Sequence, residues 1–598
     1  MKKYLIAMAA LVFCMIVTAL LTACTENEDN PIPGRDSSIV GNWYSDVSGS
    51  TFAKWNYGKT WQTTEFRKDN TGTTRIFYTI DDIAVGCEKY EFTFSASSEG
   101  VLTMTPEGRD VVTAKWKVTG NQLSLSDGNG SGTTFMKNTS DMTAKFDKWA
   151  QTKEMIDVPQ PAKYTVFVYG NAGGHMDIVI ETGLWEKVQK YLKDPNNVRV
   201  ICMYKYGKDL PEEDKAFTGK YAKPGDIVWF ELNDQTDLNK IKDEGMQAYG
   251  MGEEAKKLKI CNPNTMRMFL EFSSLACPAE DYVLAIWGHG SGFDPLKDVP
   301  GKYPINEVSS TRGVMTDEWV DDEWMDMYEM YDALNAAGID RLKTLMFHNC
   351  FMGNIESLTQ ARSFADYIFA SAHVLSSDGK LMTEFIRGLM ETGDPEKAGE
   401  LMFERSTPDW QNGYSQNGDY KMIRTDKFEA IIDAAKQLCD RILALYPTKK
   451  EAIDKATSQV YRFEAITGPE EFKYEFMYPF FDIANYAQLL AKETDDAELK
   501  TISEAMDKAF KEAFVHYCDV NNNVQHLDHY TLSVCLMRHK FYVADYVTNV
   551  PDLKPLNNFN VGYELCDFHK LTGWGNWLNT NEQALDKNPQ NGGGGTLE

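Results

Sequence analysis

Positive charge is scarce in this chain of 598 residues. Lys and Arg together number 61 against 88 Asp and Glu, which gives a formal net charge of −27 at pH 7. A surface of this sign repels phosphate backbones and anionic lipid headgroups. We therefore expect no nucleic-acid partner and no docking on a membrane by charge alone.

Closely spaced cysteines are lacking as well. Of the 11 Cys residues, Cys14 and Cys24 lie in the first 24 positions, and the others are scattered without a Cys-x-x-Cys pair. This spacing argues against a disulfide-dense scaffold and against a Cys-rich zinc site. His526 and His529 lack a helical frame and Cys neighbours, so we predict a surface loop there and no metal site.

The first 24 residues have the pattern of a targeting segment. Lys2 and Lys3 precede an apolar stretch, residues 4–20, that is short for a membrane span. Leu21-Thr-Ala-Cys24 resembles a bacterial lipobox, whose Cys becomes lipidated after cleavage; an ordinary signal peptide is the alternative. We predict a signal peptide over residues 1–24 and an outer-membrane lipoprotein of the cell envelope, anchored through Cys24.

Residues 25–38 read as a linker, rich in Pro, Asn and acidic residues. Its first part, residues 25–29, is an acidic run that resembles the surface-export signal of Bacteroidetes lipoproteins. A merely solvated tether would have the same composition, so a surface-export signal and a solvated tether both stay open.

Residues 39–149 have the short alternating runs and turn signals of an all-β domain. Gly41-Asn-Trp43 at its start resembles the opening of lipocalin-like domains, which implies a small antiparallel barrel or sandwich. A binding cavity and a spacer or docking module are both compatible with this pattern.

Residues 160–407 alternate apolar strands with helical segments, which favours an α/β fold with a mainly parallel sheet. The run 342–348 reads as a buried strand, and Cys350 follows it directly. Asn354 then has the character of an N-cap for the next helix. Cys350 would thus lie at the carboxyl end of a strand, where sites are built in open α/β sheets, and near a helix N-terminus that favours thiolate. A buried structural Cys is the alternative.

A second strand, residues 281–287, repeats this design and leads to His289 among glycines. If both strands lie parallel in one sheet, Cys350 and His289 form a nucleophile–base pair at one edge. The backbone N–H groups of Gly290 and Cys350 could then form an oxyanion hole. A loop histidine held by backbone bonds is the alternative reading of His289.

The motifs Trp287-Gly-His289-Gly-Ser-Gly292 and Asn349-Cys350-Phe-Met-Gly-Asn-Ile-Glu356 resemble the His and Cys motifs of clostripain-family cysteine peptidases, in the caspase–gingipain–legumain clan. The caspase signature Gln-Ala-Cys-x-Gly is absent. The resemblance runs from about residue 163 nearly to the C-terminus. It implies a caspase-like three-layer α/β sandwich, a helix-rich C-terminal part over residues 408–585, and endopeptidase action on a protein or peptide without a third orienting acid. It implies no cofactor, although some family members use calcium.

The chain departs from that family beside the nucleophile. His348 stands two positions before Cys350, where the family usually carries an Asp that receives a basic P1 side chain. A neutral imidazole cannot pair with arginine as a carboxylate does. Ser371 and His373 follow the next strand, where the family usually has acidic residues after the Ser. We therefore predict an S1 pocket formed by His348, Ser371 and His373, with a P1 preference altered from basic.

Three further segments carry expectations. Residues 294–326 hold the candidates for self-cleavage Lys297, Lys302 and Arg312, and an acidic run, 316–326, that reads as a solvated helix start in preference to a calcium site. Residues 532–537 and 574–578 resemble the closing strand and terminal Trp of the clostripain-type domain. Residues 586–598 read as a flexible tail.

Two hypotheses from different classes follow. One is a lipid-anchored cysteine endopeptidase that uses Cys350 and His289. The other is a catalytically inactive surface lipoprotein of the same fold that acts as a binding protein.

Overall fold

The computed structural model describes part of the chain: residues 39–48, 59–80, 83–97, 99–107, 111–126, 132–150, 161–171, 177–242, 258–290, 292–293, 314–317, 324–373, 375, 379–411, 417–461, 463, 480–521, 531–536, 563 and 566–585. The predicted signal peptide with Cys24, the linker, Lys297, Lys302, Arg312, the His526–His529 pair and the tail lie outside these residues. The chain divides into two compact units, residues 1–159 with 243–255 and residues 160–242 with 256–598.

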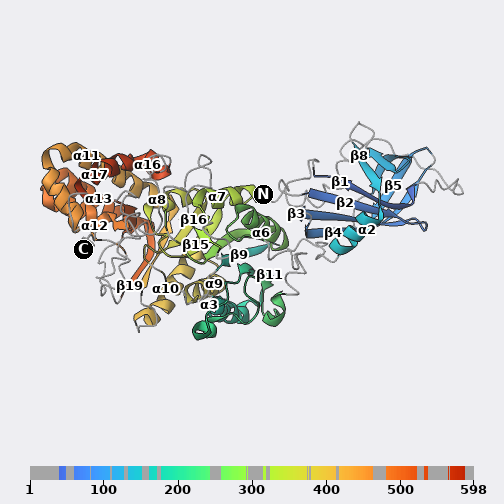
Figure 1. Ribbon diagram of the computed structural model, residues 1–598, viewed down its shortest axis with the longest axis horizontal. Coiled ribbons are helices and arrows are strands. Elements are labelled where there is room, and N and C mark those ends of the chain that lie inside the picture. Colours follow the sequence, from blue (N-terminus) through green and yellow to red (C-terminus); the bar gives the residue numbers. More distant parts are fainter. Residues whose placement is uncertain are drawn as a thin grey trace. The chain divides into compact units, whose positions relative to one another are not determined.

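The first unit contains a closed antiparallel barrel of eight strands (Figure 1). Pairing of the first strand with the last closes it, through Trp43 opposite Lys137 and Tyr44 opposite Met136. The barrel predicted as one of two all-β architectures is thus present, and the sandwich is not. Its strands are β1 (Gly41–Asp46), β2 (Lys59–Phe66), β3 (Thr71–Ile80), β4 (Ile83–Ala96), β5 (Val101–Pro106), β6 (Val112–Thr119), β7 (Gln122–Ser126) and β8 (Gly132–Lys137).

Large side chains fill the barrel interior, because every second residue of each strand points inward. Trp43, Phe66, Phe92 and Phe94 belong to this buried cluster. On the outer surface, helix α2 (Ser140–Trp149) covers a second apolar cluster, where Phe146 stacks on Phe77 with 5.8 Å between ring centroids. A polar cleft of about 190 Å³ lies beside α2.

The second unit is organised around an eight-stranded sheet in the order β11-β10-β9-β12-β15-β16-β17-β19. The five consecutive strands from β10 to β16 run parallel, and β11, β17 and β19 are antiparallel to their neighbours. The predicted mainly parallel sheet is therefore confirmed. The strands are β9 (Ala162–Asn171), β10 (Val198–Lys205), β11 (Ile227–Leu232), β12 (Ala279–Trp287), β15 (Leu342–His348), β16 (Ala365–Ala370), β17 (Asn417–Arg424) and β19 (Phe514–Asn521).

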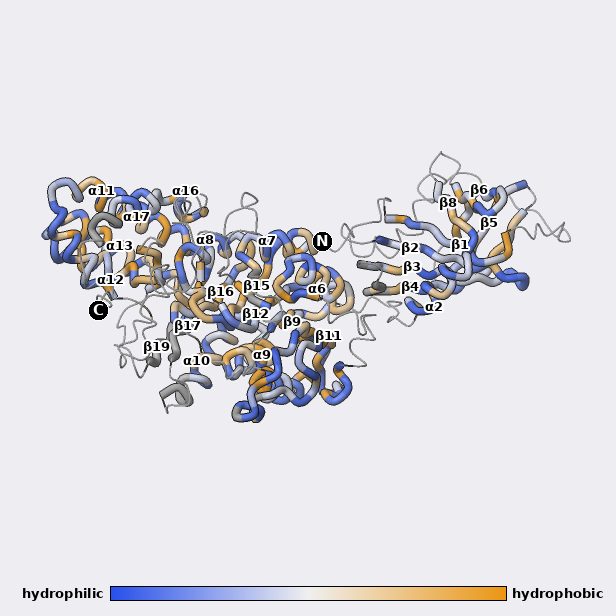
Figure 2. The backbone as a smooth tube through the Cα atoms, viewed as in Figure 1, coloured by the Kyte–Doolittle hydropathy of each residue, from blue (hydrophilic) through white to orange (hydrophobic). Residues whose placement is uncertain are grey.

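Helices cover both faces of this sheet and give it three layers (Figure 1). One face carries α3 (Asp177–Ile180), the π-helical turn η3 (Glu181–Trp185), α4 (Glu186–Val188), α9 (Lys380–Thr392) and α10 (Pro395–Gln411). The other carries α6 (Pro263–Ala276), α7 (Met327–Ala336) and α8 (Ile355–Ala361). In Figure 2, orange stretches recur along the strands and helices of this unit, as expected for a sheet buried on both sides.

The predicted helix-rich C-terminal region forms a cluster at the β19 end of the sheet (Figure 1). Its helices are α11 (Phe428–Gln459), α12 (Ile483–Thr494), α13 (Ala497–Ala513), α16 (Asp567–Thr572) and α17 (Trp574–Leu585). Asp482 and Asp496 cap the N-termini of α12 and α13 with their carboxylates. Two short two-stranded sheets pair β13 (Met315–Thr316) with β14 (Trp324–Met325), and β18 (Phe480–Asp482) with β20 (Ser533–Cys535).

One sequence expectation about this region is wrong. The strand at 532–537 does not close the main sheet, because β20 pairs with β18 in a separate small sheet; β19 is the edge strand instead. Residues 574–578, which resemble the terminal Trp, begin helix α17. The alternating apolar pattern of β19 follows directly on α13, so the sequence gives no turn signal between them.

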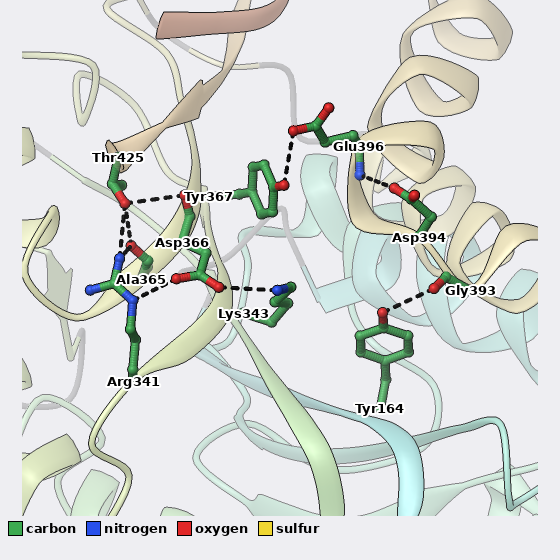
Figure 3. Close-up of polar contacts among 10 residues, drawn as sticks. All are labelled: Tyr164, Arg341, Lys343, Ala365, Asp366, Tyr367, Gly393, Asp394, Glu396 and Thr425. Atoms are coloured by element: carbon green, nitrogen blue, oxygen red, sulfur yellow. Dashed lines mark hydrogen bonds and ion pairs between the residues drawn. The ribbon is translucent and has the colours of Figure 1, made fainter. Parts of the chain in front are cut away.

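The amino ends of the parallel strands are held together by polar contacts (Figure 3). Asp366 accepts hydrogen bonds from Arg341 (2.5 Å) and Lys343 (3.1 Å), and Arg341 also donates to the carbonyl of Ala365 (2.7 Å). Burial alone would raise the pKa of Asp366, but these bonds outweigh it and hold the pKa below its ordinary value. Tyr164 reaches the carbonyl of Gly393 at 3.1 Å on the same edge. The opposite edge, at the carboxyl ends of the strands, is where the sequence places its candidate site.

Candidate active site

The two motif strands are direct neighbours. β12 and β15 pair in parallel from Val283 opposite Thr344 to Trp287 opposite His348. His289 follows Trp287 by two residues, and Cys350 follows His348 by two residues. The register therefore brings both candidate residues level with each other at the carboxyl edge of the sheet, as predicted.

The loops that carry the two residues are in contact. A methyl group on Gly290 would lie 2.6 Å from Cβ of Asn349 and 2.7 Å from the carbonyl oxygen of Cys350. No side chain fits at that distance, so glycine is required for the approach of the two backbones. The same hypothetical methyl lies 3.4 Å from the Cys350 nitrogen, which places the two predicted oxyanion-hole segments side by side.

Asn349 connects the same two loops through its side-chain amide. Its Nδ2 lies 3.1 Å from the Val314 carbonyl oxygen, 3.3 Å from that of Gly288 and 3.5 Å from that of His289. One amide thereby holds the His loop, the Cys loop and the residue before β13. No role for Asn349 could be predicted from the sequence, because its partners are backbone carbonyls that no sequence pattern marks.

The Cys350 side chain is accessible and has a polar neighbour. Of the eight cysteines whose side chains the structure describes, it is the one that is not buried, and none of the eight forms a disulfide. The backbone N–H of Leu375 donates to its Sγ at 3.4 Å. An N–H aimed at sulfur stabilises negative charge there. His289 is exposed at the same edge.

A tight turn follows the nucleophile candidate. Phe351 has a φ of 62°, a left-handed conformation that is uncommon for a bulky residue. Its carbonyl accepts a hydrogen bond from Nδ2 of Asn354 at 2.8 Å, and Asn354 also caps α8 by accepting from Ser357 N–H at 2.8 Å. The predicted N-cap is therefore confirmed.

Ser371 and His373 lie behind this turn. The carbonyl of His373 accepts from Phe351 N–H at 3.0 Å, and that of Ser371 accepts from Gly353 N–H at 2.6 Å. The Ser371 hydroxyl bonds both backbone groups of His373 at 3.1 Å, and the His373 ring packs edge-on against Phe463. Their described contacts support the nucleophile turn, and both side chains are buried.

His348 is placed differently. Its ring stacks on Trp287, with 4.2 Å between centroids and 22° between planes, and its side chain is 2% exposed. Burial lowers the pKa of this imidazole to about 3, so the ring is neutral. In the sequence, Trp287 is marked only as part of the His motif. The signal for its contact with His348 is its position two residues before His289, which matches the position of His348 two residues before Cys350.

Among the described residues, no group of three or more His, Cys, Asp or Glu side chains could hold an ion. In the acidic run, Asp317 forms a buried ion pair with Lys205 at 2.7 Å, and Asp326 caps α7 in a capping box with Glu329. These carboxylates therefore already have structural partners.

The buried neutral His348 predicts an acid-sensitive stability. Because its pKa is lower in the folded chain than the ordinary 6.5, protonation favours the unfolded chain. The free-energy cost of keeping this imidazole neutral in the folded chain is absent above about pH 6.5 and grows as the pH falls towards 3. In urea unfolding, the wild type should lose about 2 kcal/mol more than His348→Phe, between pH 7.5 and pH 5. Equal losses in the two proteins would contradict a neutral buried imidazole.

The comparisons with known proteins agree with this architecture. The clostripain family model matches residues 193–550, more than half of the chain. No helix in the described part of the chain is both long and apolar enough to cross a membrane. A comparison with curated protein sequences gives no match.

Several solved structures are similar. A secreted C11 cysteine protease from Bacteroides thetaiotaomicron, in complex with an irreversible peptide inhibitor, has 13% identity and a TM-score of 0.44, with 69% of this chain and 99% of that chain covered. An inactive zymogen C11 protease from Parabacteroides distasonis has 13% identity and a TM-score of 0.45, with 70% and 99% covered. On the strength of the family match, the chain belongs to the clostripain family of cysteine peptidases, which has a caspase-like fold.

Proposed function

We propose that the chain is a cysteine endopeptidase in which Cys350 is the nucleophile and His289 the general acid and base. The observation that supports it most directly is the contact between the two loops at the ends of β12 and β15, where Gly290 packs on Asn349 and Cys350. A thiol and an imidazole on two such loops can act as the nucleophile and the base of covalent acyl transfer.

The reaction proceeds in two steps. His289 accepts the proton of the Cys350 thiol, the sulfur attacks the scissile carbonyl carbon, and the oxyanion is bound by the N–H groups of Gly290 and Cys350. As the C–N bond breaks, the imidazolium of His289 protonates the leaving amine and a thioester remains. His289 then takes a proton from the water that attacks the thioester, and returns it to the departing sulfur as the C–S bond breaks. No third, orienting acid is assigned, because the family resemblance on which the dyad rests implies none.

The P1 preference is proposed to differ from a basic residue. A basic side chain in a buried pocket needs a carboxylate partner. The residue two positions before Cys350 is a neutral His348, and the side chains described around it, Trp287 above all, carry no carboxylate.

The remaining organisation is also a proposal. Residues 1–24 are a signal peptide, 25–38 a linker, 39–149 a lipocalin-like domain and 160–585 the peptidase region with its helix-rich part from 408. Lipidated Cys24 anchors the protein in the outer membrane of the cell envelope. The acidic run that follows Cys24 and the formal net charge of −27 support an anchor by lipid over one by charge.

Labelling tests the nucleophile. An acyloxymethylketone panel with varied P1 residues should label the wild type at one site and leave Cys350→Ala unlabelled, because the probe alkylates the attacking sulfur. His289→Ala should react at least about 100-fold more slowly. Cys439→Ala, which removes a buried thiol from α11, is the matched control and should label like the wild type. No labelling by any probe would favour the inactive binding protein instead.

The loop contact can be tested on its own. Gly290→Ala should slow probe labelling by at least about tenfold, because the methyl group forces the His and Cys loops apart. Gly338→Ala is the control. Nothing lies within 4 Å of a Cβ at Gly338, so this variant introduces no steric contact, although the positive φ strains its backbone. Equal rates for the two variants would mean that the contact does not set the reacting geometry.

Metabolic labelling with an alkyne fatty acid tests the anchor. Expressed in a bacterium with a lipoprotein pathway, the full chain should incorporate the label and sediment with membranes, whereas Cys24→Ala should do neither. A labelled Cys24→Ala chain, or an unlabelled wild type, would contradict lipidation at Cys24.

A further inference from the structure

The aromatic pair Trp287 and His348 forms the layer of the sheet directly before the proposed dyad. The two residues are register partners at the last pairing of β12 with β15. His289 and Cys350 each come two residues later, about 6–7 Å further along an extended strand. A peptide whose carbonyl carbon meets the Cys350 sulfur therefore brings its P1 residue to the edge of the sheet that ends in this pair.

Two residues that follow β16 connect the Cys350 sulfur and the Trp287 ring. Leu375 donates its N–H to the Cys350 sulfur, and a Cβ on Gly379 would lie 3.0 Å from the edge of the Trp287 ring. The residues between β16 and α9 thus contact the sulfur at one position and approach the Trp287 ring at another.

The pair also contains hydrogen-bonding atoms with nothing to bond. Nδ1 and Nε2 of His348 and Nε1 of Trp287 are all buried, and in the structure as described none of the three has a hydrogen-bond partner. Stacking occupies the faces of the two rings and leaves these edge atoms unsatisfied. Buried polar groups in native proteins nearly always have partners, so this cluster calls for one from outside the chain.

The donors and acceptor of this cluster restrict which substrate side chains can satisfy them. A neutral imidazole has one N–H donor and one bare nitrogen acceptor, and the Trp287 indole adds a second donor. Because burial lowers the pKa of His348 to about 3, the imidazole supplies no cation for an acidic side chain, and among the described residues no carboxylate interaction with it is found for a basic one. A carboxamide offers an oxygen to the donors and an N–H to the acceptor, and it carries no charge.

We infer that the Trp287–His348 pair is the specificity-determining part of the site and selects a peptide substrate with a carboxamide side chain, Asn or Gln, at P1. The inference rests on the proposed peptidase function. It identifies the substrate class that the unsatisfied donors and acceptor at this layer complement. Of the three predicted S1 residues, it assigns this role to His348 and leaves Ser371 and His373 as supports of the nucleophile turn.

The test uses tetrapeptide acyloxymethylketones that differ only at P1, applied to the full chain. The wild type should react at least about 100-fold faster with Asn or Gln than with their apolar counterparts Leu or Met, because an apolar P1 leaves the buried donors unpaired. Arg, Lys and Asp probes should be slow as well. His348→Phe keeps the stacked ring. In this variant the labelling rate with Asn or Gln probes should exceed the rate with Leu or Met probes by about tenfold or less, while the rates for Leu and Met fall little.

His348→Asp is a second variant, which should gain reactivity with Arg or Lys probes because a carboxylate now faces P1. A wild type that prefers Arg, Lys or Leu overturns the inference and leaves the peptidase intact. An unchanged selectivity in both variants overturns it too. The absence of labelling by every probe removes the proposed function and this inference together. The urea transition at pH 7.5 shows whether each variant is folded.

Discussion

The parallel pairing of β12 with β15 is the constraint on which the rest of this molecule depends. Parallel strands bring their carboxyl ends to one edge, so residues that follow the two strands by equal distances meet there. A shift of one residue in this register would turn His348 to the other face of the sheet, away from Trp287. Burial on both faces of the sheet makes such a shift costly, since residues 283–287 of β12 and 344–348 of β15 are all buried.

The two edges of the sheet differ in how completely their polar groups are satisfied. At the amino ends, the strands are joined by ion pairs of Asp366 with Arg341 and Lys343, and by a hydrogen bond from Arg341 to a backbone carbonyl (Figure 3). At the carboxyl ends, His348 and Trp287 leave three buried nitrogens without partners among the described atoms. Unpaired buried groups destabilise a fold by about 1–3 kcal/mol each. Such a cost is tolerated at functional sites, where a ligand can remove it.

Much of this arrangement could be predicted from the sequence, because it depends on local pattern. The apolar runs before His289 and Cys350 predict strands, Asn354 predicts the helix start, and the alternation of strands and helices predicts the parallel sheet. The closing strand was misplaced, since β19 follows α13 without any turn residue to mark the boundary. The role of Asn349 could not be predicted, because its amide bonds carbonyls from two segments that only the folded chain brings together.

Part of the segment between the His and Cys strands, residues 314–317, is also held to the sheet by polar contacts. Asp317 is fully buried against Lys205 and also accepts from the Ile260 N–H at 2.9 Å, and Val314 O accepts from Asn349. A buried ion pair of this kind is costly to break, because separation leaves a bare charge. A chain cut anywhere in residues 294–313 would therefore keep residues 314–317 attached to the sheet and to the Cys loop. A pocket without a carboxylate would also leave Lys297, Lys302 or Arg312 unpaired at P1, so a carboxamide preference and self-cleavage at these basic residues are incompatible in one molecule.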